Sequence, residues 1–349
     1  MDFPENLSCP VPILTHDTVQ LAHGAGGKLS NEMIDKIFLP RFSNTTLEKM
    51  EDQAILDNPG GRIAFSTDTF VVDPIFFPGG DIGDLAINGT VNDVAMSGAQ
   101  AKFLSVGFIL EEGLAFKTLH RIVLSMEKAA KTAGIQIVAG DTKVVNRGSC
   151  DKLFINTTGI GFVPDGVNIS ASNLKRGDKI LLSGTLADHG MAVMTSREGL
   201  SFQSTVRSDT AGLNHLVADM LGVSKDIHAM RDPTRGGLAT SLNEFAASSK
   251  VGIQLYDNKI PVREDVRGAC EILGIDPLYV ANEGKLLAVV PAELADDMLN
   301  AMRSNTLGKD SAIIGEVTDR HPGIVVLATG LGANRIVDMP VGEQLPRIC

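Results

Sequence analysis

Apolar and polar positions along the chain alternate between short strand-like runs and longer helical patterns. In residues 116–134 apolar side chains recur every three or four positions, which predicts an amphipathic helix that ends at its final glycine. Residues 81–98 show the same spacing, with Asp93 on or beside the apolar stripe. The runs RIAFSTDTFVV and IQIVAGDTKVV predict strands that end near Asp68 and Asp141.

The second half of the chain repeats this alternation after a loop-rich stretch, VPDGVNISASNLKRGDKILLSG. Helical patterns occur in DPTRGGLATSLNEFAASS, EDVRGACEIL and AELADDMLNAMRS, and strand patterns in VGIQLY, KLLAVV, AIIGEV and GIVVLATG. We therefore predict an α/β (α+β) protein with two domains. The predicted ranges are 1–165 for an N-terminal domain, 166–332 for a C-terminal domain and 333–349 for a flexible C-terminal tail.

A glycine-rich segment, HGAGGKLS, precedes a predicted helix for which Ser30 is the expected N-cap. The segment is not a Walker A motif, because Ala22 stands where its first glycine should be. It is not a dinucleotide fingerprint either, because Leu29 stands where the third glycine should be. The backbone N–H groups of its glycines suit an anion such as phosphate, although an ordinary turn is the alternative. These glycines are Gly24, Gly26 and Gly27.

The composition narrows the classes of function. Hydrophobic residues make up 44% of the 349 residues and the formal net charge is −11. This acidity argues against nucleic acid as the main partner, but a nucleotide can bind through Mg²⁺ held by carboxylates. No apolar run is long enough for a membrane span, and the first residues lack the pattern of a signal peptide.

The four cysteines are Cys9, Cys150, Cys270 and Cys349, and their spacing suits neither zinc nor a redox motif. Reduced thiols in a cytoplasmic protein are the simplest interpretation. Cys349 is unusual because it is the last residue of the chain, where a thiol contributes little to a core.

Five aspartates lie in segments rich in small residues. Taken singly, each could cap a helix or start a turn. Together they fit Mg²⁺ that is held jointly by protein carboxylates and substrate phosphates. They are Asp52, Asp68, Asp93, Asp141 and Asp232.

These motifs occur together in one known group of proteins. The segments VNDVAMSG, STDTF, AGDTK and DPTRGG resemble the ATP-dependent enzymes that include aminoimidazole ribonucleotide synthetase, selenophosphate synthetase and thiamine-monophosphate kinase. Within this group the chain is most similar to the HypE family of hydrogenase maturation proteins. The similarity extends from LAHGAGGK to the end and includes FFPGGDIGDLAINGTVNDVAMSGA, FILEEG, AGDTKVVNRG, RDPTRGGL, ANEGKL and the terminal PRIC.

The resemblance implies a fold and a reaction. Two N-terminal domains would pair their sheets into a barrel-like homodimer, with ATP in a cleft near that interface. The carbamoyltransferase HypF would place a carbamoyl group on Cys349. ATP-dependent dehydration would convert the thiocarbamate to a thiocyanate, and the HypC–HypD complex would carry the cyanide to the iron of a nickel–iron hydrogenase. A mobile tail would let one cysteine visit each site.

The resemblance also implies roles for single residues. The five aspartates would surround Mg²⁺ and the phosphates, and Glu283 or Lys143 would serve as base, with His189 as a third candidate. Arg347 would steer the tail and Pro346 would stiffen it, while Lys28 could equally be a solvated loop lysine. The residues implied for ATP binding are His23, Gly24, Gly26, Gly27, Lys28, Asn92, Asp93, Asp141 and Arg235.

Two other functions stay open at this point. Selenophosphate synthesis uses a cysteine or selenocysteine in a glycine-rich N-terminal loop, whereas Cys9 precedes Pro10 and the glycine loop of this chain has no cysteine. A non-catalytic scaffold that binds MgATP and presents its tail to partners would bind nucleotide without turnover. A purine-pathway cyclo-ligase would leave the terminal cysteine unexplained.

Overall fold

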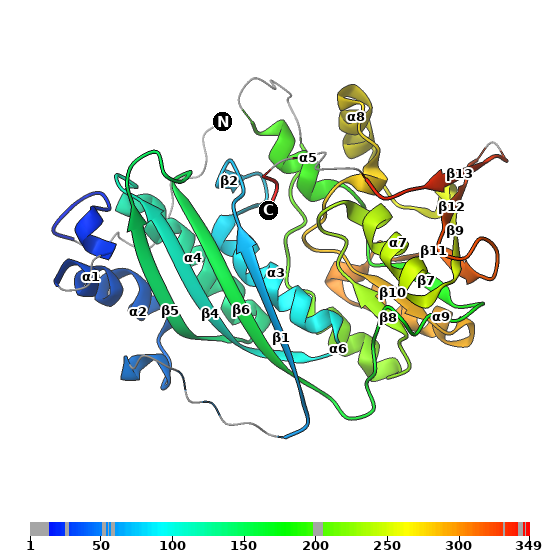
Figure 1. The fold of residues 1–349 in the computed structure, drawn as a ribbon, viewed down its shortest axis with the longest axis horizontal. Helices are drawn as coiled ribbons and strands as arrows, with labels where there is room; N and C mark the ends of the chain where they lie inside the picture. The colour runs from blue at the N-terminus through cyan, green and yellow to red at the C-terminus, as the bar shows by residue number, and fades with distance from the viewer. Residues whose placement is uncertain are drawn as a thin grey trace.

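The two halves of the chain form two α/β domains, each built around its own sheet (Figure 1). The structure is a computed structural model. It describes residues 14–24, 28–50, 54, 56, 60–197, 205–330, 332–340, 345 and 347–349.

The N-terminal domain contains a four-stranded sheet in the order β1-β6-β4-β5. Only β4 and β5 are parallel. The helices α3 and α4 cover one face of this sheet (Figure 1), and a short helical run lies beside β5. The strands are β1 (Arg62–Phe70), β4 (Gln100–Glu111), β5 (Gln136–Val145) and β6 (Leu153–Val163), with a small pair β2 (Phe76–Phe77) and β3 (Gly80–Asp81). The helices are η1 (Leu21–Gly24), α1 (Lys28–Met33), η2 (Ile34–Phe38), α2 (Leu39–Phe42), η3 (Leu47–Lys49), α3 (Ile82–Met96) and α4 (Phe116–Ala133).

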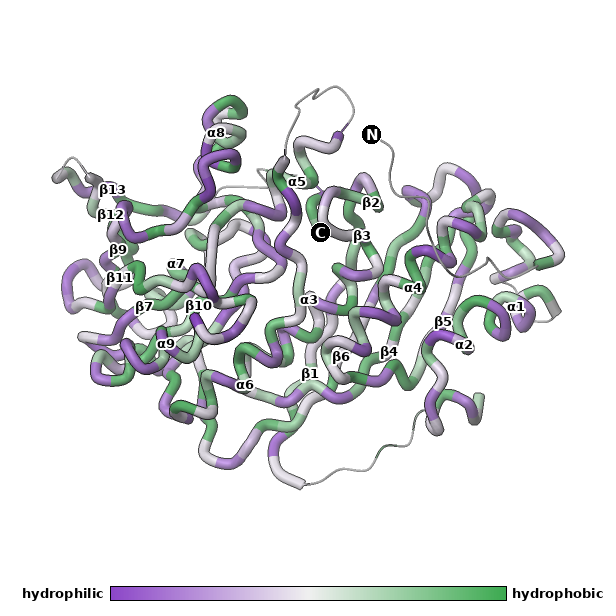
Figure 2. The backbone as a smooth tube through the Cα atoms, turned by 180° about the vertical axis from the view of Figure 1, so that it is seen from behind, coloured by the Kyte–Doolittle hydropathy of each residue, from purple (hydrophilic) through white to green (hydrophobic). Residues whose placement is uncertain are grey.

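The helix α3 is buried on all sides because it lies between the N-terminal sheet and the C-terminal domain. It contacts α4 within its own domain and α6 and β8 of the C-terminal domain. Its first turn is capped by Asp81, whose carboxylate accepts the N–H groups of Gly83 and Asp84. Figure 2 shows hydrophobic and hydrophilic residues alternating along both α3 and α4. In α4 the polar side faces solvent, whereas in α3 polar residues such as Asn88 and Asn92 are buried. Polar groups inside α3 therefore need partners from other elements.

The C-terminal domain contains a seven-stranded sheet in the order β13-β12-β9-β11-β7-β10-β8, with helices on both faces. The strand β10, which lies between β7 and the edge strand β8, is buried on both sides: Leu287 and Val289 pack in the core with α7, and Ala288 and Val290 pack with α9. The strands are β7 (Lys179–Leu182), β8 (Ala229–Arg231), β9 (Gly252–Tyr256), β10 (Leu287–Val290), β11 (Ala312–Thr318), β12 (Val325–Ala328) and β13 (Asn334–Val337). The helices are α5 (Asp188–Thr195), α6 (Asn214–Val223), α7 (Gly237–Ser249), η4 (Asp257–Lys259), α8 (Glu264–Leu273), η5 (Pro277–Tyr279), η6 (Ala292–Leu294), α9 (Ala295–Ser304) and η7 (Thr306–Gly308).

Most predicted elements are present, and the amphipathic helix ends as expected, with Gly134 in the left-handed conformation at φ 70°. The N-cap prediction for Ser30 is wrong, because α1 begins at Lys28 and the Ser30 hydroxyl donates to the His23 carbonyl at 2.8 Å. The strand β5 continues past Asp141 to Val145 instead of ending there.

The seven-stranded sheet extends into the segment predicted as tail. Residues 334–337 form β13, which pairs antiparallel with β12, so the segment outside the sheet begins after Val337. Of the predicted site residues, Gly26, Gly27 and Asp52 lie outside the described residues, as do Cys9 and Pro346. No helix in the described part of the chain combines the length and apolar character needed to cross a bilayer.

A buried carboxyl group in α3 makes stability depend on pH. Burial, followed by the nearby charge of Asp81, raises the pKa of Asp84 to about 7. Between about pH 4 and pH 7 this group is protonated in the folded protein and ionised in the unfolded chain, so its contribution to stability falls as pH rises. The Asp84→Asn variant should therefore lose less stability over this window, by at most about 1.4 kcal/mol per pH unit.

Urea unfolding of wild type and Asp84→Asn at several pH values measures this difference. Asp310→Asn, at an exposed position, is the matched control and should follow the wild type. Equal pH slopes for wild type and Asp84→Asn would contradict the assignment.

Candidate functional site

Four carboxyl groups from separate elements come together where the two domains meet. Asp68 lies on β1, Asp93 on α3, Asp232 directly after β8, and Glu283 in the loop before β10. We call these four residues the acid cluster. Each is within electrostatic reach of the other three. Three of them were predicted as metal ligands and the fourth as a base.

The pKa of every group in the acid cluster is raised. Burial is the largest cause for all four. Repulsion from Asp93 adds to burial and raises the pKa of Asp232 to about 7, and Asp232 in turn is the largest charge that raises the pKa of Glu283. The hydroxyl of Ser66 donates to Asp93 at 2.7 Å and opposes its shift.

The acid cluster carries more negative charge than its surroundings balance. Arg235 lowers the pKa of Asp68 and Asp93, as Arg231 does for Asp93 and Asp232, but neither reverses the shift. Oε1 of Glu283 is buried and has no hydrogen-bond partner among the described residues. Such a set fits a divalent cation, because Mg²⁺ needs only one or two carboxylates besides water and substrate phosphates. The described residues do not form a ready-made cage of three or more ligands.

Asn92 of α3 holds two loops of the C-terminal domain in place beside the acid cluster. Its side-chain oxygen accepts the N–H of Leu213 at 2.7 Å, and its amide donates to the carbonyls of Ala211 at 3.0 Å and Glu283 at 3.3 Å. From the sequence, Asn92 was predicted to contribute to the ATP site. In the structure its amide is engaged with the backbone, so it positions Glu283.

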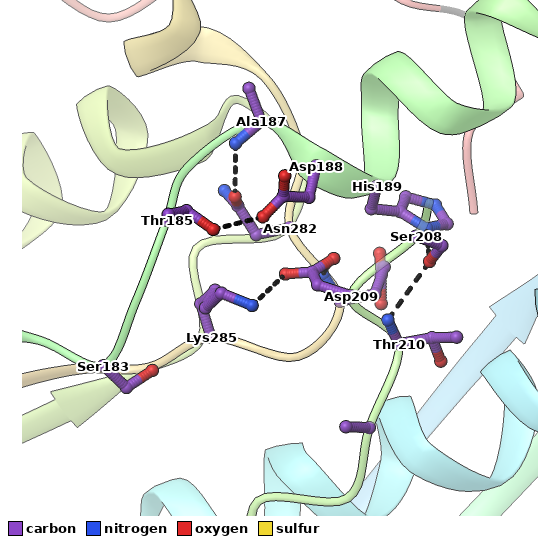
Figure 3. Close-up of polar contacts among 12 residues, drawn as sticks. Ser183, Thr185, Ala187, Asp188, His189, Ser208, Asp209, Thr210, Asn282 and Lys285 are labelled. Carbon is purple, nitrogen blue, oxygen red and sulfur yellow. Dashed lines mark hydrogen bonds and ion pairs between the residues drawn. The ribbon is translucent and has the colours of Figure 1, made fainter. Parts of the chain in front are cut away.

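Asn282 and Gly284 fix Glu283 from either side. Asn282 accepts the N–H of Ala187 at 2.8 Å (Figure 3) and donates to the carbonyl of Pro233 at 3.0 Å, which joins three loops. A side chain at Gly284 would collide with the carbonyl oxygen of Asp209. The loop therefore needs glycine directly after the glutamate.

A buried ion pair lies next to the acid cluster. Lys285 contacts Asp209 at 3.1 Å (Figure 3), and both side chains are almost fully buried. Burial acts to raise the pKa of Asp209, but Lys285, followed by His189 and the N–H of Glu283, outweighs it and holds the pKa below its ordinary value. Asp209 also accepts the N–H of Glu283 at 3.1 Å.

Neither Lys285 nor Asp209 was among the residues predicted from the sequence. Ser208-Asp209-Thr210 repeats the pattern of Thr67-Asp68-Thr69, and this repetition is the signal that could have found this ion pair.

The end of the chain docks at the same domain junction. The N–H groups of Val71 and Asp73 donate to the main-chain oxygens of Cys349 and Arg347, each at 3.2 Å. His189, the third candidate base, contacts the carbonyl of Ile348 at 2.9 Å. The terminal cysteine is therefore held directly after β1, the strand that carries Asp68.

A second group of predicted residues borders a cavity of about 340 Å³ between β5 and the helical run at the N-terminus. Most of its wall is apolar or aromatic, and the polar part includes His23, Gly24, Asp141 and Lys143. Lys143 lies 3.5 Å from Asp141, and both side chains are exposed. Nε2 of His23 is buried without a hydrogen-bond partner among the described residues. The apolar wall includes Met33, Ile34, Phe38, Phe42, Val106 and Phe108.

Asp141 and Lys143, at the polar rim of the cavity, point to the face of the N-terminal sheet opposite Asp68. Asp141 is in register with Gly107, Asn156 and Thr69, so it points to the same face as Thr69. Asp68, the neighbour of Thr69, points to the opposite face. Three strand spacings, roughly 14 Å, also separate Asp141 from β1. Within one chain, Asp141 therefore does not join Asp68 in the acid cluster.

Comparison with known families identifies both domains. Residues 50–163 match the N-terminal domain of AIR synthase related proteins, and residues 175–328 match their C-terminal domain.

Curated relatives match over almost their whole length. The chain is 50% identical over 336 residues to carbamoyl dehydratase HypE of Azotobacter vinelandii, which covers 96% of this chain and 98% of that protein. It is 49% identical over 338 residues to carbamoyl dehydratase HypE of Escherichia coli, covering 95% and 100%.

Solved structures agree with the sequence relatives. The crystal structure of hydrogenase maturation protein HypE in complex with ATP aligns with a TM-score of 0.91 at 50% identity, covering 95% of this chain and 99% of that one. The HypE–HypF complex aligns with a TM-score of 0.78 at 50% identity, covering 88% and 99%. Thiamine-monophosphate kinase of Stenotrophomonas maltophilia, at 18% identity and a TM-score of 0.65, covers 88% and 96% and shares the fold.

Removing one carboxylate from the acid cluster should stabilise the protein without metal. At about pH 8 the ionised Asp232 is repelled by its neighbours, so Asp232→Asn should raise the free energy of unfolding by roughly 2–4 kcal/mol. Millimolar Mg²⁺ should stabilise the wild type more than the variant, because the cation binds only the folded cluster.

Thermal unfolding with and without MgCl₂ tests both effects, with Asp310→Asn as the exposed control. A less stable Asp232→Asn protein at this pH, or equal Mg²⁺ effects, would show that the acid cluster does not carry unbalanced charge.

Proposed function

The chain belongs to the HypE proteins of the AIR synthase related family, and from this premise we propose that it dehydrates a carbamoyl group on its own C-terminal cysteine. The enzyme is an ATP-dependent carbamoyl dehydratase of hydrogenase maturation. The reaction converts the S-carbamoyl group of Cys349 to a thiocyanate, which supplies the cyanide ligand for the iron of a nickel–iron hydrogenase.

One observation carries this function: the last three residues dock at the domain junction and are linked to the buried Glu283 by a short series of contacts. The His189 side chain contacts the tail, and the segment Ser208–Asp209 links it to Glu283. A scaffold that only displays its tail would have no need to place Cys349 at this junction.

The reaction removes one oxygen and two protons from the carbamoyl group. The carbamoyl oxygen is a poor leaving group, and transfer of the terminal phosphoryl group of ATP to it creates a phosphate leaving group. Loss of both N–H protons with this phosphate then closes the C≡N bond. The products are the thiocyanate, ADP and inorganic phosphate. Sulfur suits this chemistry because a thiocyanate can surrender cyanide to an iron acceptor.

We assign Glu283 as the base that takes the N–H protons. A carboxylate whose pKa is raised by burial holds a proton more strongly than an exposed one, which suits general base catalysis near neutral pH. Lys143, the other candidate base, lies beside Asp141 on the opposite face of the sheet, so we assign it to the phosphates of ATP.

Asp68, Asp93 and Asp232 are the residues that would hold Mg²⁺. When bound, Mg²⁺ supplies positive charge that neutralises the phosphates during phosphoryl transfer. Arg235 would add a fixed positive charge, since it already lowers the pKa of Asp68 and Asp93.

The apolar cavity beside β5 fits the base of ATP, and Asp141, Lys143, His23 and the glycine loop border its polar side. Within one chain the polar rim formed by Asp141 and Lys143 points away from the face that carries Asp68. In a homodimer that pairs the two N-terminal sheets, this rim would face the partner chain. The relative crystallised with ATP supports nucleotide binding by this fold.

The uncovered face of the N-terminal sheet supports this homodimer. Ile63, Phe65 and Ile109 lie on it with exposed fractions of 51%, 69% and 43%. Asp141 points to the same face. Large apolar side chains gathered on one sheet face are typical of a protein interface.

The partners follow from the reaction. The carbamoyltransferase HypF would load Cys349, and a relative crystallised as the HypE–HypF complex supports this pairing. The HypC–HypD complex would accept the cyanide. Cys150 and Cys270 are free thiols, which supports the expectation that the protein works in the cytoplasm.

Mass spectrometry of the C-terminal peptide tests the function. Incubation with HypF, carbamoyl phosphate and MgATP should place a carbamoyl group on Cys349, which then loses one water. Glu283→Gln should accept the carbamoyl group but dehydrate it roughly 10²–10⁴ times more slowly.

Glu293→Gln, at an exposed position, is the matched control, and Cys349→Ala should remain unmodified. A wild-type adduct that persists with MgATP would favour the scaffold, and unchanged dehydration by Glu283→Gln would exclude it as the base.

A charge on the uncovered sheet face should dissociate the homodimer. Phe65→Asp places two carboxylates in the proposed interface, one from each chain, and should raise the dimer dissociation constant at least roughly 100-fold. Light scattering during gel filtration measures the mass. Ile272→Asp is the control because Ile272 is as exposed but lies on α8, and an unchanged mass for Phe65→Asp would contradict this interface.

A further inference from the structure

The C-terminal tail, described at Leu345 and Arg347–Cys349, adds a short antiparallel segment beside residues 71–73. The N–H of Val71 donates to the main-chain oxygen of Cys349 and the N–H of Asp73 to that of Arg347. The guanidinium of Arg197 donates to the same Arg347 oxygen at 2.9 Å. The tail is therefore recognised largely through its backbone.

His189 binds the remaining backbone oxygen of the tail. A carbonyl can only accept, so the contact of 2.9 Å between Nε2 and the oxygen of Ile348 makes Nε2 the protonated nitrogen. Nδ1 of the neutral ring then accepts from the hydroxyl of Ser208 at 2.8 Å, and the Ser208 oxygen accepts the N–H of Thr210 at 3.1 Å (Figure 3). Each donor in this series of hydrogen bonds therefore has an acceptor.

The surroundings of His189 hold its ring in one orientation. The ring is fully buried at the N-terminal end of α5, and Phe77 packs against it edge-on at 5.3 Å. Burial lowers the pKa of His189 more than Asp209 and the Ile348 carbonyl raise it, which keeps the ring neutral.

Ile348 anchors the tail by its side chain. It is only 4% exposed and belongs to the N-terminal core, together with Val193 of α5 and Ala281 of the loop before Glu283. Arg347 adds an ion pair to Asp151 at 2.8 Å. The side chains that anchor the tail thus include those of Arg347 and Ile348, the two residues before Cys349.

We propose that His189 is a positioning residue that latches the carbonyl of Ile348 and so holds the modified Cys349 at the dehydration site. This rests on the proposed function. Because the latch binds the backbone of the preceding residue, it holds the tail whether the sulfur carries hydrogen, a carbamoyl group or a cyano group. Ser208, which orients the ring, is followed by Asp209, which binds the N–H of Glu283. His189 and Glu283 therefore both contact the loop that carries Ser208 and Asp209.

The latch has opposite consequences for the two steps of the cycle. Dehydration needs the tail docked, whereas loading by the carbamoyltransferase needs the tail released into another protein's site. A weakened latch should slow the first step and leave the second unchanged or faster. A role of His189 in stability alone would not separate the two steps.

The test compares His189→Leu, which removes both hydrogen bonds, with His189→Gln, whose amide can still donate to the carbonyl. Single-turnover dehydration of protein carrying a preformed carbamoyl group, at saturating MgATP, should slow roughly 10- to 100-fold in His189→Leu and recover partly in His189→Gln. Loading by HypF should not slow, and ATP affinity should stay the same.

Two further variants complete the design. His215→Leu is the matched control, because exposed His215 also contacts a backbone carbonyl, that of Thr132 at 2.9 Å, far from the tail in sequence. Ile348→Ala removes the side-chain anchor of the tail and leaves His189 in place, and it should also slow dehydration. This variant keeps the proposal testable if His189→Leu fails to fold. Normal dehydration in a folded His189→Leu protein overturns the proposal.

A measurement without turnover separates this proposal from the proposed function. Alkylation of the Cys349 thiol in unmodified protein, located by peptide mass, should proceed roughly tenfold faster in His189→Leu than in wild type or His215→Leu. If the wild type never dehydrates but this acceleration is seen, the dock stands and the dehydratase function fails. Equal labelling rates in all three proteins overturn the latch.

Discussion

The burial of four carboxyl groups at the junction of two domains is the constraint on which the rest of this structure depends. Asp68, Asp93, Asp232 and Glu283 repel one another, and burial removes the water that would screen them. The electrostatic cost of burying these carboxyl groups together is offset only when a cation binds among them. The surrounding structure holds the carboxyl groups in place meanwhile, through the amides of Asn92 and Asn282 and the close approach of Gly284 to Asp209.

The central position of α3 makes this junction possible. A helix buried on all sides can present one flank to the N-terminal sheet and the other to loops of the C-terminal domain. Asp93 turns toward Ser66 of β1, while the adjacent Asn92 reaches loops more than a hundred residues away. Neighbouring residues of one helix thus connect the metal-binding side and the base-bearing side of the proposed site.

The tail docks at the same junction. Recognition through its backbone suits a tail whose terminal cysteine would carry different groups during the reaction cycle. Backbone hydrogen bonds and the side chain of Ile348 form most of the dock. These contacts are individually modest, so docking can remain reversible. The tail can then alternate between the docked state and release to partner proteins. Such release is required if Cys349 is to receive a new carbamoyl group in each cycle.

The sequence by itself determined the elements and the chemistry that they carry. Periodicity predicted α3, α4, β1, β5 and the strands β9 to β12, because a buried face imposes a regular spacing on apolar residues, but it did not identify β4, β6, β7, β8 or β13. The motifs and the terminal PRIC indicated the family and its reaction. They also predicted Glu283 as a candidate base and Cys349 as the modified residue.

Only the tertiary structure decided which of these residues meet. Strand alternation sends Asp68 and Asp141 to opposite faces of one sheet, and the alternation cannot be placed in space until the sheet order is known. Because of the domain packing, the Asn92 amide donates to the carbonyl of Ala211, and Lys285 lies beside Asp209. It also set His189, the weakest of the three candidate bases, against the carbonyl of Ile348, 159 residues away, because contacts between distant segments leave no periodic trace in the chain.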